Sequence, residues 1–366
     1  MRPSRIVDFS DSFTAADTFP ANVVSHSKYA YQLDDYVKQL QSRQGSLFCD
    51  TSQCALHVLE TQDSGTAPEM KTGCIRTPAD LDQHLGSASM ACRPDPVCRF
   101  AFVTAPHARE KLNVDRTTLM RVLSWHQVMP EFLDFLFSFG RTDHSKDFHF
   151  TGFRSEAKLL EADATVYLPE LGRSGRELRM CYTIKSVENV VTQGSQRNWP
   201  WSIRTTSLYH SFDIATSRSF WLIIKANTLL RGRVKALCDG RRLYRTDLVG
   251  EDSRTKQAFD STLRSHQLLC ALAGENWRWY INSIEEKVQD LTRDILTETV
   301  DLYKQAPRHA QTWNSIPGTE LTTVPSNGPE TSRFTFENLQ EIHFVEEKTN
   351  EALLIIEANM SLLPQT

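Results

Sequence analysis

The stretch RNWPWSIRTTSLYHSF occupies residues 197–212. Within it, Trp199, Trp201 and Ile203 alternate with other residues, so they share one side of an extended chain. This period of two is typical of a β-strand with one buried face. Two tryptophans one residue apart give that face a large apolar area to bury. The stretch therefore predicts a strand packed against a covering layer, and the rest of the fold follows from its neighbours.

The apolar register then moves to Leu208 and Phe212, on the opposite side of the same strand. Such a switch predicts a β-bulge or a strand that changes its neighbour. The next apolar segment, FWLII at 220–224, is apolar on both faces, which predicts a central strand. Before the opening stretch, residues 178–184 alternate clearly with period two. These three segments predict adjacent strands in one sheet.

Helical patterns lie on both sides of these strands in the chain. We expect helices at 22–42, 115–126, 130–140 and 252–302, the second capped by Asp115 and the last as one long helix or two, bent near Gly274. Further strands are expected at 46–49, 55–59 and 97–104, with a loop at 63–73. Another helix is expected to start at Thr77-Pro78, with Thr77 as its cap. The fold class is therefore α/β.

The chain divides into four segments by composition. Residues 1–22 are polar and aperiodic, and we expect them to be flexible. A folded domain is expected over 23–303. Residues 304–333, rich in proline and threonine, are expected to form a linker. A final helix is expected over 334–366, with a short heptad-like seam broken at Glu346 and Thr349, which is compatible with ordinary helix packing or with a coiled coil.

Composition excludes some classes of protein. The net charge of −4 gives no general electrostatic attraction to nucleic acid. No apolar run approaches the ~18 residues needed to cross a bilayer, and no signal peptide is evident, so we expect a cytoplasmic location. The eight cysteines form no C-x-x-C pair; they are expected to be free thiols, with a structural zinc site as the alternative.

No residue set predicts an active site, and no Walker or Rossmann motif occurs. The strongest metal-site candidate is Asp143, His144, Asp147 and His149, in an expected loop. The alternative is a solvated or structural role for these residues. His266 lies on an apolar helix face and is expected to be a hydrogen-bonded core histidine. A basic patch over 231–245 is either a solvated face or a contact for lipid headgroups or an acidic partner.

Two arginines lie beside tryptophans: Arg204 in the tryptophan strand, and Arg278 between Trp277 and Trp279. An arginine in such a position can stack on the ring while its guanidinium group binds a carboxylate. We regard these residues as structural elements that attach strands to helices. The expected structural signature is Trp199, Trp201, Arg204, Tyr209, His210, Trp277, Arg278 and Trp279.

Several blocks in one order resemble the CorA-like transporter domain found in fungal proteins. They include WPWSIRTTSLYHSFD (199–213) and ENWRWYINSIEEK (275–287), together with 124–156, 172–188 and 334–363. The resemblance implies an α/β/α sandwich, with a mixed central sheet flanked by helices, leading into a long C-terminal stalk-like helix. CorA-type channels are pentamers that pass Mg²⁺ and are closed by intracellular Mg²⁺ bound between cytosolic domains.

This chain departs from the channel pattern because it has neither a Gly-Met-Asn signature nor a membrane helix. The resemblance therefore implies a non-conducting cytosolic domain with a regulatory or assembly role, and not an enzyme. Mg²⁺ is the only ion it implies, and no metal-sensing carboxylate can be matched. The alternatives are an interaction module that self-associates through 334–366, with a membrane protein as a further partner, and a metal-dependent enzyme using His144 and His149.

Overall fold

A computed structural model describes ten segments of the chain: 6–24, 28–62, 69–85, 94–143, 151–160, 167–190, 199–241, 243–244, 251–298 and 336–362. The chain divides into two compact units. The first comprises Met1–Glu275 and Ile355–Thr366, and the second comprises Asn276–Leu354. The α/β fold belongs to the first unit.

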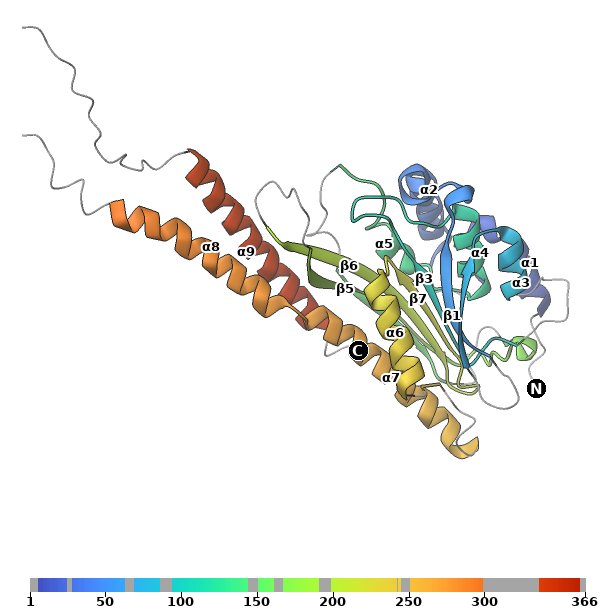
Figure 1. The fold of residues 1–366 in the computed structure, drawn as a ribbon. Helices are drawn as coiled ribbons and strands as arrows, with labels where there is room; N and C mark the ends of the chain where they lie inside the picture. Colours follow the sequence, from blue (N-terminus) through green and yellow to red (C-terminus); the bar gives the residue numbers. More distant parts are fainter. Residues whose placement is uncertain are drawn as a thin grey trace, which may run out of the picture. The chain divides into compact units, whose positions relative to one another are not determined.

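The first unit contains a seven-stranded mixed sheet in the order β2-β1-β3-β7-β6-β5-β4 (Figure 1). Only β3 and β7 are parallel; the other neighbours pair antiparallel. The strands are β1 (Leu56–Gln62), β2 (Glu69–Ile75), β3 (Cys98–Val103), β4 (Phe153–Lys158), β5 (Glu177–Asn189), β6 (Trp201–Asp213) and β7 (Ser219–Ile224).

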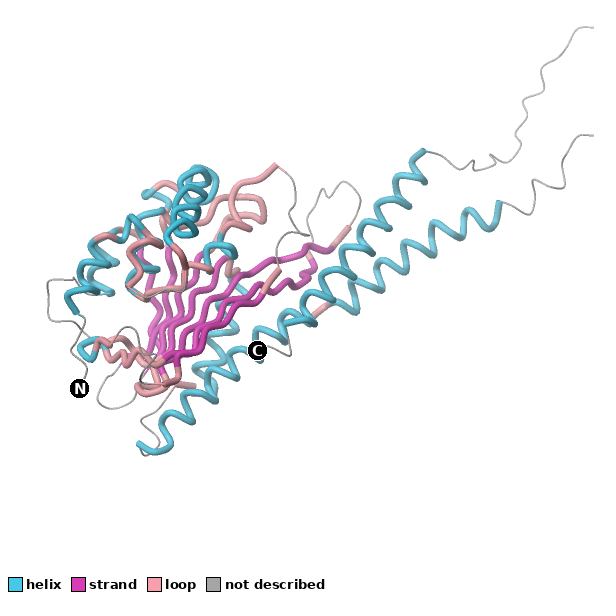
Figure 2. Tube along the Cα trace, turned by 180° about the vertical axis from the view of Figure 1, so that it is seen from behind, coloured by secondary structure: helices cyan, strands magenta, loops and turns pink. Residues whose placement is uncertain are grey.

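Helices cover the two faces of this sheet. The first face carries the helices that precede β4, and their apolar residues join those of the strands in one buried cluster. These helices are α1 (Ile6–Thr14), α2 (Ala30–Leu47), α3 (Pro78–Leu85), α4 (Arg116–Trp125) and α5 (Phe132–Leu136). The second face carries α6 (Thr228–Arg241) and α7 (Glu251–Gly274), which contribute to a second buried cluster. Figure 2 shows the sheet between these two layers.

The central strand β7 explains why both faces need a cover. All six of its residues are buried. Leu222 and Ile224 belong to the cluster on the first face, whereas Trp221 and Ile223 belong to the cluster on the second. A strand with apolar side chains on both sides is stable only between two packed layers. The prediction of a central strand at 220–224 is confirmed.

The end of the last helix, α9 (Phe336–Leu362), also belongs to the first unit. Leu362 is part of the cluster on the second face. The Asn359 side chain donates to the carbonyl of Lys185 on β5 at 2.7 Å and accepts from the Lys185 backbone N–H at 3.2 Å. Lys185 lies beyond the part of β5 that pairs with β4. Asn359 therefore binds the backbone of β5 as a neighbouring strand would.

The described part of the second unit consists of α8 (Trp277–Glu298) and the portion of α9 up to Leu354. Lys287 on α8 forms an ion pair with Glu341 on α9 at 3.2 Å, and its ammonium lies 6.0 Å from the centre of the Phe344 ring. In the described part of the chain, no helix is both long enough and apolar enough to serve as a membrane span.

The predicted α/β class, the mixed sheet flanked by helices and the C-terminal helix are confirmed. The helix expected over 252–302 is two helices, α7 and α8, separated at Gly274. The caps predicted at Thr77 and Asp115 are present: each accepts a backbone N–H, from Asp80 at 3.1 Å and from Thr118 at 3.0 Å. The expected linker, 304–333, lies outside the described residues.

Other local predictions were wrong. The N-terminal segment expected to be flexible contains α1, whose Phe9 and Phe13 are buried edge-on against the Trp125 ring. The helix expected over 22–42 begins at Ala30 and continues to Leu47, through the first half of the strand expected over 46–49. Part of the loop expected over 63–73 is β2, which forms a hairpin with β1.

The bulge predicted in β6 is absent, because β5 and β6 pair in one unbroken register from Trp201 to Asp213. The apparent switch has a different cause. From Thr206 to His210 the strand is buried on both faces, with Leu208 in the second cluster and Tyr209 in the first. Apolar residues therefore occur on both sides of a regular strand.

Candidate functional site

The parallel strands β3 and β7 form a topological switch point. The chain leaves β3 for α4 on the first face, and it leaves the adjacent β7 for α6 on the second face. Connections that diverge in this way open a crevice beyond the carboxyl ends of the two strands, where α/β proteins commonly bind ligands. A cavity of about 440 Å³ lies there, within the size range of small-molecule sites. We call it the carboxyl-edge crevice.

Polar side chains of β5, β6, α6 and the connecting segments line this crevice. Glu188 on β5 accepts a hydrogen bond from Arg204 Nε on β6 at 3.0 Å and another from the Asn227 amide. The Asn227 Oδ1 accepts the backbone N–H of Leu230 at 2.8 Å, so this residue also caps α6. The first turn of α6 is thus held against the ends of β5 and β6, which fixes one wall of the crevice.

Lys225, directly after β7, has a left-handed backbone with a φ of 64°. A non-glycine residue in this region is strained, and such strain concentrates at functional sites. Its ammonium donates to the carbonyl of Ala108 and lies 5.3 Å from the centre of the Phe139 ring. These two contacts hold the lysine in the turn that forms the floor of the crevice.

The crevice has the chemistry of a site for a small, polar, negatively charged molecule. Its lining includes the cations Arg204, Lys225 and Arg231 but a single carboxylate, Glu188. The Arg231 Nε is buried without a hydrogen-bond partner among the described residues. Hydroxyl groups from the surrounding strands and from α6 complete the lining: Thr104, Ser186, Thr205, Thr206 and Thr228.

A second polar cluster lies at the opposite, amino-terminal edge of β3 and β7. It follows from the strand register, because one row of paired residues crosses six strands on the first face. The row reads Glu60, Arg99, Phe220, Ser211, Arg179 and Glu156. The sheet therefore carries charged side chains into the protein interior along a single line. We use the name amino-edge cluster for this row together with the polar residues packed around it: His84, Asp95, His126, Arg173, Glu177, Asp213 and Arg218.

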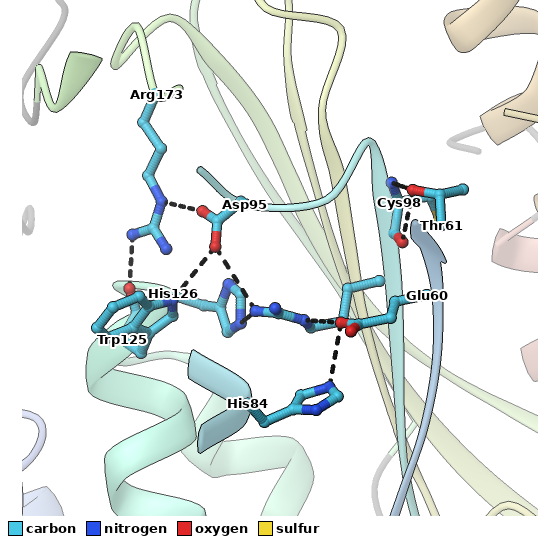
Figure 3. Close-up of polar contacts among 9 residues, drawn as sticks. Glu60, Thr61, His84, Asp95, Cys98, Trp125, His126 and Arg173 are labelled. Atoms are coloured by element: carbon cyan, nitrogen blue, oxygen red, sulfur yellow. Dashed lines mark hydrogen bonds and ion pairs between the residues drawn. The ribbon is translucent and has the colours of Figure 1, made fainter. Parts of the chain in front are cut away.

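The ion pairs of the amino-edge cluster are short (Figure 3). Arg99 Nε lies 3.0 Å from Glu60 Oε2, and Arg173 Nε lies 2.6 Å from Asp95 Oδ2. His84 Nε2 lies 3.1 Å from the same Glu60 oxygen. Burial would raise the pKa of Asp95, but the Arg173 and Arg99 charges reverse this and hold it well below its usual range.

His126 connects the cluster to the hydrophobic core. Its ring stacks on Phe220 with ring centres 3.5 Å apart, and its Nε2 lies 3.2 Å from Arg99 Nη1. Burial and the neighbouring Arg99 charge lower the pKa of His126 well below its ordinary value. The imidazole is therefore neutral at physiological pH and can accept a hydrogen bond from the guanidinium.

The predicted signature residues are distributed over both units. Trp199 and Trp201 are partly buried near the start of β6, and Arg204 lines the carboxyl-edge crevice. Tyr209 is buried edge-on against Phe132. His210 is stacked on Trp221 at 3.9 Å between ring centres.

The other signature residues are in the second unit. Trp277 is buried edge-on against Tyr280, and the Arg278 guanidinium lies 5.6 Å from the Trp279 ring centre. The prediction of a hydrogen-bonded His266 is confirmed: its Nδ1 lies 2.7 Å from the Tyr182 hydroxyl.

The metal-site prediction stays without support from the described residues. Asp143 is exposed and lies at the end of a described segment, whereas His144, Asp147 and His149 lie outside it. Within the segments that the structure describes, no group of three or more histidine, cysteine or acidic residues is arranged to hold a metal ion. The seven described cysteines are free thiols, as predicted.

Sequence reasoning missed both polar clusters. Arg99 could have been found, because it interrupts the otherwise apolar strand around VCRFAFV, and an arginine in a buried strand requires a carboxylate partner. The residues of the carboxyl-edge crevice gave no such signal. They come from segments between Thr104 and Leu272 that only the fold brings together.

Comparison with known proteins agrees with this architecture. A search of curated proteins found no significant match. The family model of CorA-like transporters matches residues 11–296, which contain all seven strands and nearly the whole of α8. The match covers most of the chain, and the protein therefore belongs to the CorA-like transporter family.

Proposed function

We propose that this chain is a cytoplasmic regulatory and assembly domain related to divalent-cation transporters, with Mg²⁺ as the ion concerned, and that it is not an enzyme. The observation that carries the proposal is the family match over residues 11–296. It extends from the α/β unit into α8, so the folded body and the helix that follows it are shared with the family. The proposed organisation is a folded domain that begins with α1, ahead of the expected boundary at residue 23, and continues to residue 303, followed by a linker and a stalk-like helix.

Regulation requires that a ligand change the state of the protein. The carboxyl-edge crevice, a cavity of about 440 Å³ with cationic walls on the folded body, supports regulation by a small anion, and the role proposed for Mg²⁺ rests on the family match alone. Assembly requires an exposed surface that a second copy covers. Exposed apolar side chains on α9 support that role: Phe336, Leu339, Ile342, Leu353, Leu354 and Met360.

Sedimentation velocity of the purified chain tests the regulatory proposal. We expect the sedimentation coefficient distribution to change between EDTA and millimolar MgCl₂, and not in NaCl of the same ionic strength. An identical distribution in all three buffers, over a range of protein concentrations, would contradict a Mg²⁺-regulated assembly.

The alternative is an interaction module that assembles through its C-terminal helix independently of Mg²⁺. Exchange of Leu339 and Ile342 to serine removes two exposed apolar groups from α9. The alternative predicts that this variant loses self-association in every buffer. The matched control changes Leu159 and Leu160, which are exposed in the first unit, and should associate like the wild type.

A further inference from the structure

Several hydrogen-bond donors of the amino-edge cluster have no hydrogen-bond partner among the described residues. Arg173 is 8% exposed and Arg179 is 2% exposed, so both guanidinium groups are almost completely removed from solvent. Each uses one side of its guanidinium for a carboxylate: Arg173 Nε for Asp95 at 2.6 Å, and Arg179 Nε for Glu177 at 2.7 Å. Among the described residues, Arg173 Nη2 and Arg179 Nη1 have no hydrogen-bond partner, although Arg179 Nη1 forms a long ion pair with Glu156 Oε2 at 3.6 Å.

A third arginine adds two more unused donors. The Nε and Nη1 atoms of Arg218 are buried without a partner among the described residues, and no carboxylate of those residues forms an ion pair with it. The nearest acid along the strand, Asp213, is already occupied: it accepts the N–H and hydroxyl of Ser174 and the N–H groups of Ala215 and Thr216.

The three arginines line the same cavity, which has a volume of about 40 Å³. Phe220 and Ser211 of the cross-strand row lie on its floor, and Asp95, His126 and Glu177 lie on its walls. Figure 3 shows how Arg173 and Asp95 face each other beside His126. A space of this size accepts one small ion or a few water molecules, and is too small for a nucleotide.

Gly172 holds Arg218 at this cavity. Its φ of 72° lies in the left-handed region, and a Cβ placed on it would lie 2.4 Å from Arg218 Nε. Only glycine lets the guanidinium lie this close to the backbone at that turn. The local structure thus places an unpaired cation beside two buried guanidinium groups that each keep a donor unused.

Buried charged donors without acceptors are strongly destabilising, and guanidinium groups are the side chains best suited to bind small anions. We propose that Arg173, Arg179 and Arg218 form a binding site for one small inorganic anion, either chloride or a tetrahedral oxyanion such as phosphate. The anion supplies the acceptor that Arg173 Nη2 and the two Arg218 nitrogen atoms lack among the described residues, and a closer one for Arg179 Nη1. This site is separate from the carboxyl-edge crevice and does not depend on the proposed regulatory function.

The test is thermal unfolding of the purified full chain at constant ionic strength, in sodium gluconate with increasing chloride or phosphate. We expect a saturable rise in Tm on the order of 5 °C, because a ligand that binds only the native state stabilises it. Saturation by chloride identifies a halide site, and saturation by phosphate alone identifies an oxyanion site. No saturable rise with either anion would overturn the proposal and leave ordered water as the acceptor.

The variant Arg218→Gln separates binding from a purely structural role. Arg218 forms no ion pair with any of the described residues, so in gluconate we expect the variant to be at least as stable as the wild type. In saturating anion it should be less stable than the wild type, which reverses the order. The control Arg254→Gln changes an exposed arginine on α7 and should keep the full anion response.

The proposal would be contradicted if Arg218→Gln and the wild type kept the same order of stability in gluconate and in saturating anion. Diffraction from crystals grown in bromide provides a direct second measurement, with an anomalous peak expected between the three guanidinium groups if the site takes halides. If the titration shows saturation by chloride and no such peak appears, the stabilising ion binds elsewhere and this assignment is wrong.

Discussion

His266 Nε2 on α7 lies 3.1 Å from His210 Nδ1 on β6, and both rings are buried. Tyr182 completes the chain through its hydroxyl group, 2.7 Å from His266 Nδ1, and the His210 Nε2 lies 3.0 Å from the Ser219 hydroxyl. Every imidazole nitrogen of the pair thus has a partner. Burial lowers the pKa of His266 to about 4, and burial together with His266 lowers that of His210.

This pair predicts acid sensitivity. The unfolded histidines take up protons below pH 6.5, whereas folded His266 does so only near pH 4, so the unfolded state binds more protons between these values. Stability should therefore be complete above pH 6.5 and fall as the pH decreases toward 4. The shift of His266 alone corresponds to about 3 kcal/mol.

Urea unfolding at pH 7 and pH 5 measures the effect. The variant His266→Gln should show a smaller loss between the two pH values than the wild type. The control His343→Gln, at an exposed histidine on α9, should leave the pH dependence unchanged. Equal pH dependence in the wild type and His266→Gln would show that this pair does not sense acid.

The Glu60–Arg99 ion pair predicts strong coupling. Both side chains are under 10% exposed, so removing one partner leaves a buried charge with fewer contacts. We expect Arg99→Met to lower the free energy of unfolding by about 3 kcal/mol or more. The double variant Glu60→Gln/Arg99→Met should lose less free energy of unfolding than Arg99→Met alone, because the carboxylate at position 60 is replaced by a neutral amide. A double-mutant cycle in urea measures this, and additive losses would contradict the coupling.

The backbone at Lys225 predicts that glycine and alanine substitutions there reverse their usual order of protein stability. Within regular structure, a protein with glycine is normally less stable than the same protein with alanine by roughly 0.5–1 kcal/mol. At Lys225 the left-handed φ of 64° penalises alanine, so Lys225→Gly should be more stable than Lys225→Ala. At Lys235, exposed within α6, the usual order should hold. Chemical unfolding of the four variants decides between these outcomes, and the same order at both positions would argue against strain at Lys225.

Asp115 predicts a capping effect. Its carboxylate accepts the backbone N–H of Thr118 at 3.0 Å and the Thr118 hydroxyl at 2.6 Å. Burial alone would raise the pKa of Asp115, but these hydrogen bonds outweigh it and lower the pKa. Asp115→Ala should lower the free energy of unfolding by about 1–2 kcal/mol. Asp50→Ala is the control, since Asp50 is exposed and makes no side-chain cap. A loss below 0.5 kcal/mol would mean that the cap is dispensable.

How far the sequence predicts this fold depends on the segment. The strands around FWLII and the caps at Thr77 and Asp115 follow from local patterns, which is why they were predicted. The helix α1 was missed because its order depends on distant contacts: Phe9 and Phe13 are buried against Trp125. Propensity and periodicity carry no information about such a partner.

The polar sites show the same limit. A single residue such as Arg99 can be identified from its strand, but its partner Glu60 comes from another strand, β1. The unused donors of Arg173, Arg179 and Arg218 are defined by what does not contact them, which no pattern in the chain reveals. Sites built from side chains on several elements require the fold before they can be recognised.

Asn359 shows what the last helix does for the sheet. Beyond the end of β4, the outer side of β5 presents backbone groups that an edge strand of another molecule could pair with. The Asn359 amide occupies those of Lys185, and the helix that carries it anchors Leu362 in the adjoining core. We therefore expect α9 to hinder edge-to-edge aggregation at this position, and its loss to favour intermolecular β-pairing there.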